Sequence, residues 1–122
     1  MEFQTKKTIY LQIADYICEQ ILLDQWLAQA KIPSVRELAV NVQVNPNTIM
    51  RTYAFLEEQG IIKTQRGIGY FVAENAKAKV IEFKKQEFLK TDLPQLFKSM
   101  ALLNIDLPTL QKLYEETKHD KK

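Results

Sequence analysis

The sequence predicts a mainly α-helical protein with one small β-hairpin, and three observations in residues 32–72 lead to that prediction. A short amphipathic helix is capped by Ser34 in the sequence S-V-R-E, and another follows Asn45 with the sequence P-N-T-I. A glycine-containing tip, R-G-I-G, then separates two short runs of β-forming residues. This element order is that of a winged helix-turn-helix, in which one helix enters the major groove of DNA.

The first predicted helix runs from Thr8 to Leu27, with the Thr8 hydroxyl available as a cap. Its apolar side chains recur every three or four residues, which places them on one helical face. They are Ile9, Ile13, Ile17 and Ile21, with Tyr10, Ala14 and Leu22 beside them. Cys18 is the single cysteine and falls within this pattern, so we expect a small core residue and no internal disulfide. Residues 28–32 then form a loop.

A second helix begins with a capping box, because Ser34 is followed three residues later by Glu37. It extends to about Asn41, and Gln43-Val44 form the turn that follows. The apolar positions of this helix are expected to face inward. These positions are Val35, Leu38, Ala39 and Val42.

The third helix begins at Asn45-Pro46, because Asn suits the N-cap and Pro suits the first helical position. Gly60 ends it in the left-handed conformation that glycine adopts most easily. One face of the helix is apolar and is expected to pack against the two earlier helices. The residues of this face are Ile49, Tyr53 and Leu56.

The hairpin is predicted from strands 61–65 and 70–72, joined by Arg66-Gly67-Ile68-Gly69. The two glycines supply the positive φ angles of a hairpin tip. Residues 1–75 are therefore expected to form the winged helix-turn-helix domain.

Residues 76–122 are predicted to form a helical tail. The polar segment 74–79 is expected to be a connector, and helical spacing then continues from Val80 to Leu103. Pro94 predicts an interruption at 91–94. Asp106 and Pro108 resemble an N-cap followed by an early proline, and they predict a final helix.

The composition excludes several classes of protein. The 122 residues contain no apolar run long enough to span a membrane, and the N-terminus lacks the layout of a signal peptide, so we expect a cytoplasmic protein. The single histidine, His119, and the absence of a Cys/His cluster argue against a metal site, a cofactor or catalysis. Residues 1–75 contain seven Lys/Arg and eight Asp/Glu, so any case for DNA binding depends on where the cations lie.

The motifs of the predicted helices and hairpin resemble those of the GntR family of bacterial transcription regulators. The similarity covers about residues 8–73 and is carried by P-S-V-R-E-L-A, V-N-P-N-T-I and R-G-I-G-Y-F-V. The short helical remainder is similar to the YtrA-type subfamily, in which the tail is a dimerisation element. Gln29 stands where the family usually has a glycine, and Met50 occupies a position that is often polar in the family.

The resemblance implies a set of DNA-contacting residues. The start of the third helix would present side chains to base edges, with Asn suited to adenine, Arg to guanine, and Thr or Met to the thymine methyl group. The second helix and the hairpin tip would contact the backbone or the minor groove. The implied contacts are Ser34, Arg36, Asn47, Thr48, Met50, Arg51, Arg66 and Gly67, with Lys63 and Lys31 as weaker candidates for a phosphate.

Some of these residues also have simpler interpretations. Arg36 could pair with a nearby acid, and Thr48 could cap the third helix. Asn45 is better explained as a cap than as a base reader. Tyr53 and Phe55 are better explained as core or subunit contacts than as base-stacking groups.

The tail has more apolar residues than so few helices can bury within one subunit, so a dimer interface is a better explanation than a ligand pocket. The residues expected in it are Phe83, Phe88, Leu96, Phe97, Met100, Leu103, Leu110 and Leu113.

Two functions follow as hypotheses. The first is a homodimeric, sequence-specific transcription regulator, a repressor, that occupies a palindromic DNA operator. The alternative is a winged-helix protein-interaction module without specific DNA binding, which the negative balance of residues 1–75 would allow. A small-molecule effector stays open as a further partner.

Overall fold

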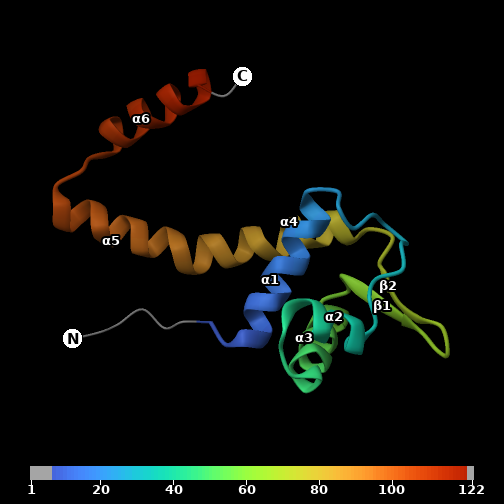
Figure 1. Cartoon of the computed structure of the whole chain (residues 1–122). Coiled ribbons are helices and arrows are strands. Elements are labelled where there is room, and N and C mark those ends of the chain that lie inside the picture. Colours follow the sequence, from blue (N-terminus) through green and yellow to red (C-terminus); the bar gives the residue numbers. More distant parts are fainter. Residues whose placement is uncertain (1–6, 121–122) are drawn as a thin grey trace. The chain divides into compact units, whose positions relative to one another are not determined.

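The computed structural model describes residues 7–120, and the chain divides into two compact units, the first extending to Phe83 and the second beginning at Lys84. Residues 1–6 and 121–122, which fall within the predicted domains 1–75 and 76–122, lie outside the described residues. The elements, labelled in Figure 1, are α1 (Ile9–Leu22), α2 (Val35–Val42), α3 (Pro46–Glu58), β1 (Ile62–Gln65), β2 (Gly69–Val72), α4 (Ala76–Glu87), the π-helical segment η1 (Phe88–Asp92), α5 (Leu93–Leu103) and α6 (Leu107–Asp120). The predicted fold, mainly helical with one hairpin, is confirmed.

Helix α1 provides much of the core, as its apolar spacing predicts. Ile13, Ile17 and Ile21 are buried on one face, together with Cys18. The helix ends at Leu22 and not at residue 27, because the backbone turns left-handed at Asp24, with φ of 60°. Apolar residues beyond this turn continue the spacing without continuing the helix, and periodicity does not distinguish the two cases. Thr8 occupies the N-cap position, but its side chain makes no capping hydrogen bond.

The capping box that begins α2 is present with both of its hydrogen bonds. The Glu37 N–H donates to Ser34 Oγ at 3.1 Å, and the Ser34 N–H donates to Glu37 Oε1 at 2.8 Å. Leu38 and Ala39 are buried, as predicted. Gln43 then turns the chain with a φ of 57°, so the link between the two helices is as short as the sequence indicates.

Helix α3 begins and ends at the predicted residues. The Asn47 N–H donates to Asn45 Oδ1 at 2.7 Å, which confirms Asn45 as the cap. Tyr53 is fully buried, and its hydroxyl donates to the Pro33 carbonyl oxygen at 2.7 Å. Its burial makes Tyr53 a core residue, and the same burial, with smaller contributions from nearby Tyr70 and Glu37, raises the pKa of its phenol.

The hairpin pairs β1 with β2 in antiparallel register, from Ile62 opposite Val72 to Gln65 opposite Gly69. The segment 28–32, expected to be a loop, adds backbone pairing to the other edge of β2. Its Lys31 forms an isolated bridge with Phe71. A pairing this short has no detectable period in the sequence, so it was not predicted.

The expected connector 74–79 is mostly helical, because α4 already begins at Ala76. Ala76 and Val80 are buried in the core of the first unit, and the polar residues between them hide this spacing in the sequence. The predicted interruption at 91–94 is a π-helical segment and not a gap. Pro94 has no N–H to donate, and the Leu93 N–H donates five residues back, to the Phe88 carbonyl oxygen.

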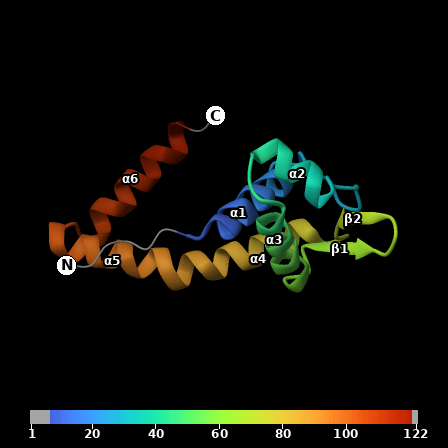
Figure 2. The same ribbon diagram turned by 60° about the horizontal axis from the view of Figure 1, so that its bottom comes forward.

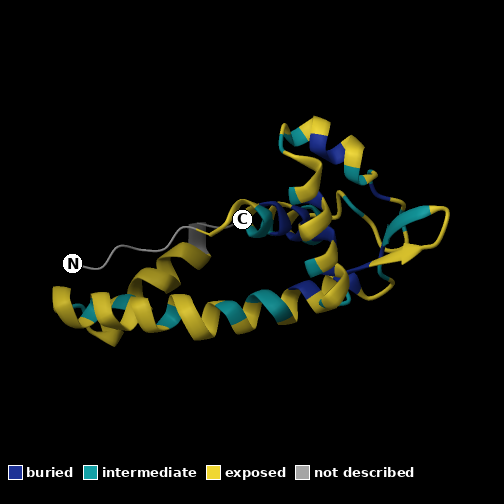
Figure 3. Ribbon diagram, turned by 90° about the horizontal axis from the view of Figure 1, so that it is seen from below, coloured by how far each residue is buried: buried dark blue, intermediate teal, exposed yellow. Residues whose placement is uncertain are grey.

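The second unit is capped as predicted but has little buried surface. Asp106 Oδ1 accepts hydrogen bonds from the Thr109 Oγ1 hydroxyl at 2.6 Å and from the Thr109 N–H at 3.0 Å, and both bonds lower the pKa of Asp106. Figure 3 shows the buried residues concentrated in the first unit, whereas α5 and α6 are exposed or half-buried along their length.

Candidate nucleic-acid interface

The N-terminal half of α3 presents the side chains that were predicted to contact bases. Asn47, Met50 and Arg51 are exposed, whereas Thr48 is half-buried. The capping role considered for Thr48 belongs to Asn45. An exposed amide and an exposed guanidinium in the first turns of a helix are the groups that hydrogen-bond adenine and guanine in a major groove.

Arg51 is held by an aromatic ring. Its guanidinium carbon lies 4.1 Å from the centroid of the Tyr10 ring, which α1 supplies. Such a cation–π contact orients a side chain that would otherwise sample many rotamers. The sequence marks Arg51 as a candidate contact, but nothing in its spacing points to Tyr10 as its neighbour.

Arg36 lies exposed on α2, close to the beginning of α3. It lines a shallow surface hollow together with Val40, Val44 and Pro46. Among the side chains that the structure describes, no Asp or Glu forms an ion pair with Arg36, the alternative considered above. Its charge is therefore available to a partner that reaches the helix-turn-helix link.

Ser34 stands at the N-terminus of α2, where free N–H groups favour a phosphate. Its own N–H is already bonded to Glu37, and the carboxylate adds a negative charge at the same place. Hydrogen bonds from the Ser34 N–H and hydroxyl, with the Lys31 charge, lower the pKa of Glu37, so this carboxyl is ionised at neutral pH. A phosphate contact at Ser34 would have to be made beside that charge.

The hairpin tip is open on all sides. Lys63, Arg66 and Gly67 are exposed, and a Cβ added to Gly67 would meet no atom within 4 Å. Gly67 has a φ of 77°, which favours glycine. A Cβ added to Gly69 would lie 3.0 Å from Lys31 Cε, so the Lys31 stem lies along the hairpin. The tip thus presents a cation and a bare backbone together.

Figures 1 and 2 agree in placing α2 beside α3, with the hairpin leading away from the C-terminal end of α3. The structure therefore gathers the predicted contacts from three elements into the first unit. The sequence did not identify Tyr10 or the exposed Ile68 as parts of this surface. The position of Ile68 between two glycines at a predicted hairpin tip is a sequence signal that could have identified it as exposed.

The predicted dimer residues divide between the two units. Phe83, in the first unit, is half-buried, and its ring meets that of Phe55 edge-on at 5.7 Å. The other seven lie in the second unit, where Met100 and Leu110 are half-buried. The remaining five are exposed, and they are Phe88, Leu96, Phe97, Leu103 and Leu113.

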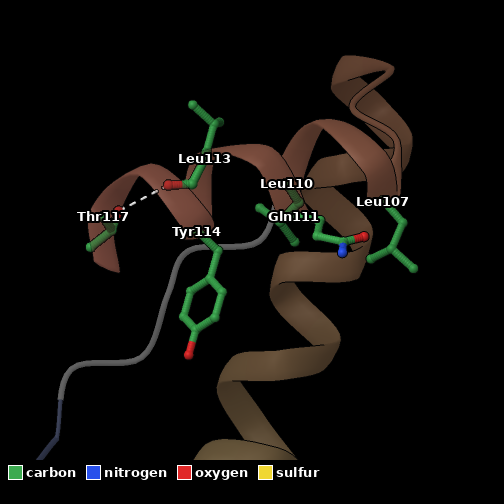
Figure 4. A pocket seen from close by; sticks show the side chains of 6 residues that line it. All are labelled: Leu107, Leu110, Gln111, Leu113, Tyr114 and Thr117. Atoms are coloured by element: carbon green, nitrogen blue, oxygen red, sulfur yellow. Dashed lines mark hydrogen bonds between the residues drawn. The ribbon is translucent and has the colours of Figure 1, made fainter. Parts of the chain in front are cut away.

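Helix α6 has a shallow, largely apolar hollow on its surface, shown in Figure 4. Its lining includes Leu110 and Leu113, which are among the predicted dimer residues, and also Leu107 and Tyr114, which are not. All six residues that line the hollow come from this one helix, so it has the character of an unpaired helix face.

Within residues 7–118, no group of three or more His, Cys, Asp or Glu side chains is arranged to hold a metal ion. No described helix is both long enough and apolar enough to cross a membrane.

Comparisons with known proteins agree with this geometry. Residues 9–72 match the family model of bacterial regulatory proteins, gntR family. The chain is 38% identical over 114 residues to the HTH-type transcriptional repressor YtrA of Bacillus subtilis, covering 93% of this chain and 87% of that protein.

Two solved structures are similar to this one. One, from Bacteroides thetaiotaomicron and assigned to the GntR family of transcriptional regulators, has a TM-score of 0.82 at 43% identity and covers 94% of this chain and all of its own. The other, the DNA-binding domain of AraR in complex with an operator, has a TM-score of 0.55 at 29% identity and covers 60% of this chain and 88% of its own.

Proposed function

Because the chain belongs to the gntR family of bacterial regulatory proteins, which are DNA-binding transcription regulators, we propose that it is a homodimeric repressor that occupies a palindromic operator. Each subunit would place α3 in a major groove and the hairpin tip against the adjacent backbone or minor groove. Such a protein acts in the cytoplasm, where the bacterial chromosome lies. The similarity to a protein named as a repressor supports the proposed direction of control.

The observation that carries this proposal is the exposure of Asn47 and Arg51 in the N-terminal half of α3, together with the exposure of Arg36, which shares a hollow with Pro46 at the start of that helix. These side chains carry the donors that read adenine and guanine edges. Arg66 and Gly67 add a second contact point at the hairpin tip. Together they supply positive charge locally in a unit whose overall charge is not basic, so affinity would come from placement and not from net charge.

Dimerisation is supported by the second unit. Its helices expose large apolar residues, including Phe97 at 54% and Leu103 at 67% exposure. When the second units of two copies pair, the exposed apolar residues of each copy are covered by those of the other, as in an isologous two-fold dimer. Two half-sites then multiply the modest specificity of one small domain. The two-fold axis makes them an inverted repeat, and the recurrence of the major groove on one face of the duplex spaces them by about one helical turn.

The test is selection of bound DNA from a random duplex pool, followed by a salt titration on the selected sequence. We expect an inverted repeat, and an affinity that falls steeply with salt because phosphate contacts release counterions. Arg51→Ala should lower the affinity by roughly 1–3 kcal/mol and relax base preference at one position in each half-site. If the folded protein enriches no motif, the proposal fails and the protein-interaction module becomes the better hypothesis.

A further inference from the structure

We propose that Tyr10 is a positioning residue for DNA recognition, because its ring holds the Arg51 guanidinium in the orientation in which that group reads the operator. The inference rests on the DNA-binding function proposed above. It adds a residue from α1, outside the helix-turn-helix, to the set that determines base preference.

Tyr10 is held by one turn of α3. The Arg51 guanidinium carbon lies 4.1 Å above its ring centroid, and the Phe55 ring meets its edge at 6.2 Å with an interplanar angle of 79°. The hydroxyl of the fully buried Thr52 lies 2.9 Å from the Tyr10 carbonyl oxygen and 3.0 Å from the Thr48 carbonyl oxygen, and it can donate its one proton to either. Thr52 therefore contacts the backbone of Tyr10 and Phe55 packs against the edge of its ring, both independently of Arg51.

The Phe55 ring also packs edge-on against the Phe83 ring, with 5.7 Å between the ring centroids and an interplanar angle of 67°. The ring beneath Arg51 is therefore backed by a second and a third aromatic side chain. A ring confined in this way offers the guanidinium a fixed platform and not a mobile neighbour.

A guanidinium carbon 4.1 Å from the ring centroid is close enough for the group to lie face-on against the ring, and in that orientation its edge stays free. All five N–H donors of arginine point outward in the plane of the group, so a ring stacked on the face competes with none of them. Two parallel donors remain available for guanine O6 and N7 or for a phosphate. Because the side chain is already oriented, less rotamer freedom is lost on binding.

The experiment measures binding of Tyr10→Leu to the duplex that the wild-type protein selects, and to single-base variants of that duplex. Leu removes the aromatic face and keeps an apolar side chain, whereas Tyr10→Phe keeps the face. We expect Tyr10→Leu to bind roughly threefold to thirtyfold more weakly, which corresponds to the free energy of a cation–π contact. We also expect it to lose preference at the base assigned to Arg51. Tyr10→Phe should behave as the wild type.

Two controls separate positioning from a general effect on folding. Tyr16→Leu makes the same substitution at another α1 tyrosine, which is 44% exposed, and should leave affinity and base preference unchanged. In an Arg51→Ala background, Tyr10→Leu should have little further effect, because the side chain that it positions is absent. Equal losses in both backgrounds would overturn the proposal, and so would an unchanged base preference in Tyr10→Leu.

Nuclear magnetic resonance on the free protein distinguishes this failure from that of the proposed function. A ring current should shift the Arg51 Hδ resonances upfield in the wild type and in Tyr10→Phe but not in Tyr10→Leu. A wild type without this shift would overturn the proposed positioning, whatever DNA it selects. An intact shift in a protein that selects no duplex would reject the DNA-reading role and the proposed function together, and would leave the stacked geometry standing.

Discussion

The hydroxyl of Tyr53, at the centre of α3, donates a hydrogen bond of 2.7 Å to the carbonyl oxygen of Pro33, the residue before the cap of α2. The bond ties α3 to the segment that leads into α2, at a partly buried point. Tyr53→Phe should lower the free energy of unfolding by about 1–3 kcal/mol, because the Pro33 carbonyl loses its partner in the core. Urea denaturation would measure this change.

Tyr16→Phe is the matched control for that prediction, because Tyr16 lies on the exposed side of α1. It should change stability by less than about 0.5 kcal/mol. If the two variants lose equal stability, the hydrogen bond to Pro33 contributes nothing measurable.

Gln29 has a φ of 66°, in the left-handed region that favours glycine. The Gln29 N–H also donates to the Val72 carbonyl oxygen at 2.9 Å, so pairing with β2 holds the residue in this conformation. Gln29→Gly should raise the free energy of unfolding by roughly 0.5–1 kcal/mol, because relief of left-handed strain outweighs the added freedom of the unfolded chain. Thermal denaturation would measure the gain.

A glycine introduced where the backbone is already helical should have the opposite effect. Gln12 lies within α1, and Gln12→Gly should lower stability by about 1 kcal/mol. A loss of stability in Gln29→Gly would show that the observed φ carries no strain in solution.

The capping box of α2 predicts a dependence of stability on pH. Hydrogen bonds from Ser34 hold the pKa of Glu37 below its ordinary value, so folding favours the ionised carboxyl. The stabilisation is present above the unfolded pKa of about 4.3 and is lost as the pH falls through the lower folded value. Ser34→Ala should raise the pKa of Glu37 in a carbon-13 titration, because the hydroxyl contact is removed.

Asp106, whose pKa is lowered by Thr109 in the second unit, serves as the internal reference. Its titration should be the same in Ser34→Ala and in the wild type. An unchanged Glu37 titration in the variant would mean that the hydroxyl makes no contribution to the lowered pKa.

Arg66, at the open tip of the hairpin, should contact DNA through phosphate and not through one particular base. Arg66→Ala is expected to weaken binding about equally for all duplexes and to reduce the slope of log affinity against log salt by about 1. Lys85→Ala, which removes an exposed cation from α4, is the control and should leave the slope unchanged. A change in base preference in Arg66→Ala would instead assign Arg66 to direct readout.

The exposed apolar faces of the second unit predict a change of oligomeric state. Phe97→Glu should convert a dimer into a monomer of 14.3 kDa in sedimentation, because a charge would have to be buried at the interface. Leu23→Glu is the matched control, since Leu23 is 60% exposed in the turn after α1 of the first unit. A wild type that sediments as a monomer at all concentrations would remove the dimer from the proposed function.

The local elements of this protein were predictable from its sequence. The Ser34–Glu37 capping box, the Asn45–Pro46 helix start and the glycine at Gly67 each depend on contacts between residues at most a few positions apart. Such contacts have a fixed spacing, so reading them needs no knowledge of the rest of the fold. The predicted C-terminal end of α1 and the predicted start of α4 were wrong. Apolar spacing continues past the left-handed turn at Asp24, and polar residues hide the buried positions Ala76 and Val80.

Tertiary structure decided which side chains meet across the fold. The hydrogen bond between Thr52 and Tyr10 joins residues 42 positions apart, and the stacking of Arg51 on the same tyrosine depends on α1 crossing α3. Helical periodicity places each residue on a face but does not say which residue of another helix that face will contact. That choice is made by the packing of whole helices, so the sequence could nominate Arg51 as a DNA contact while only the folded chain could show what holds it.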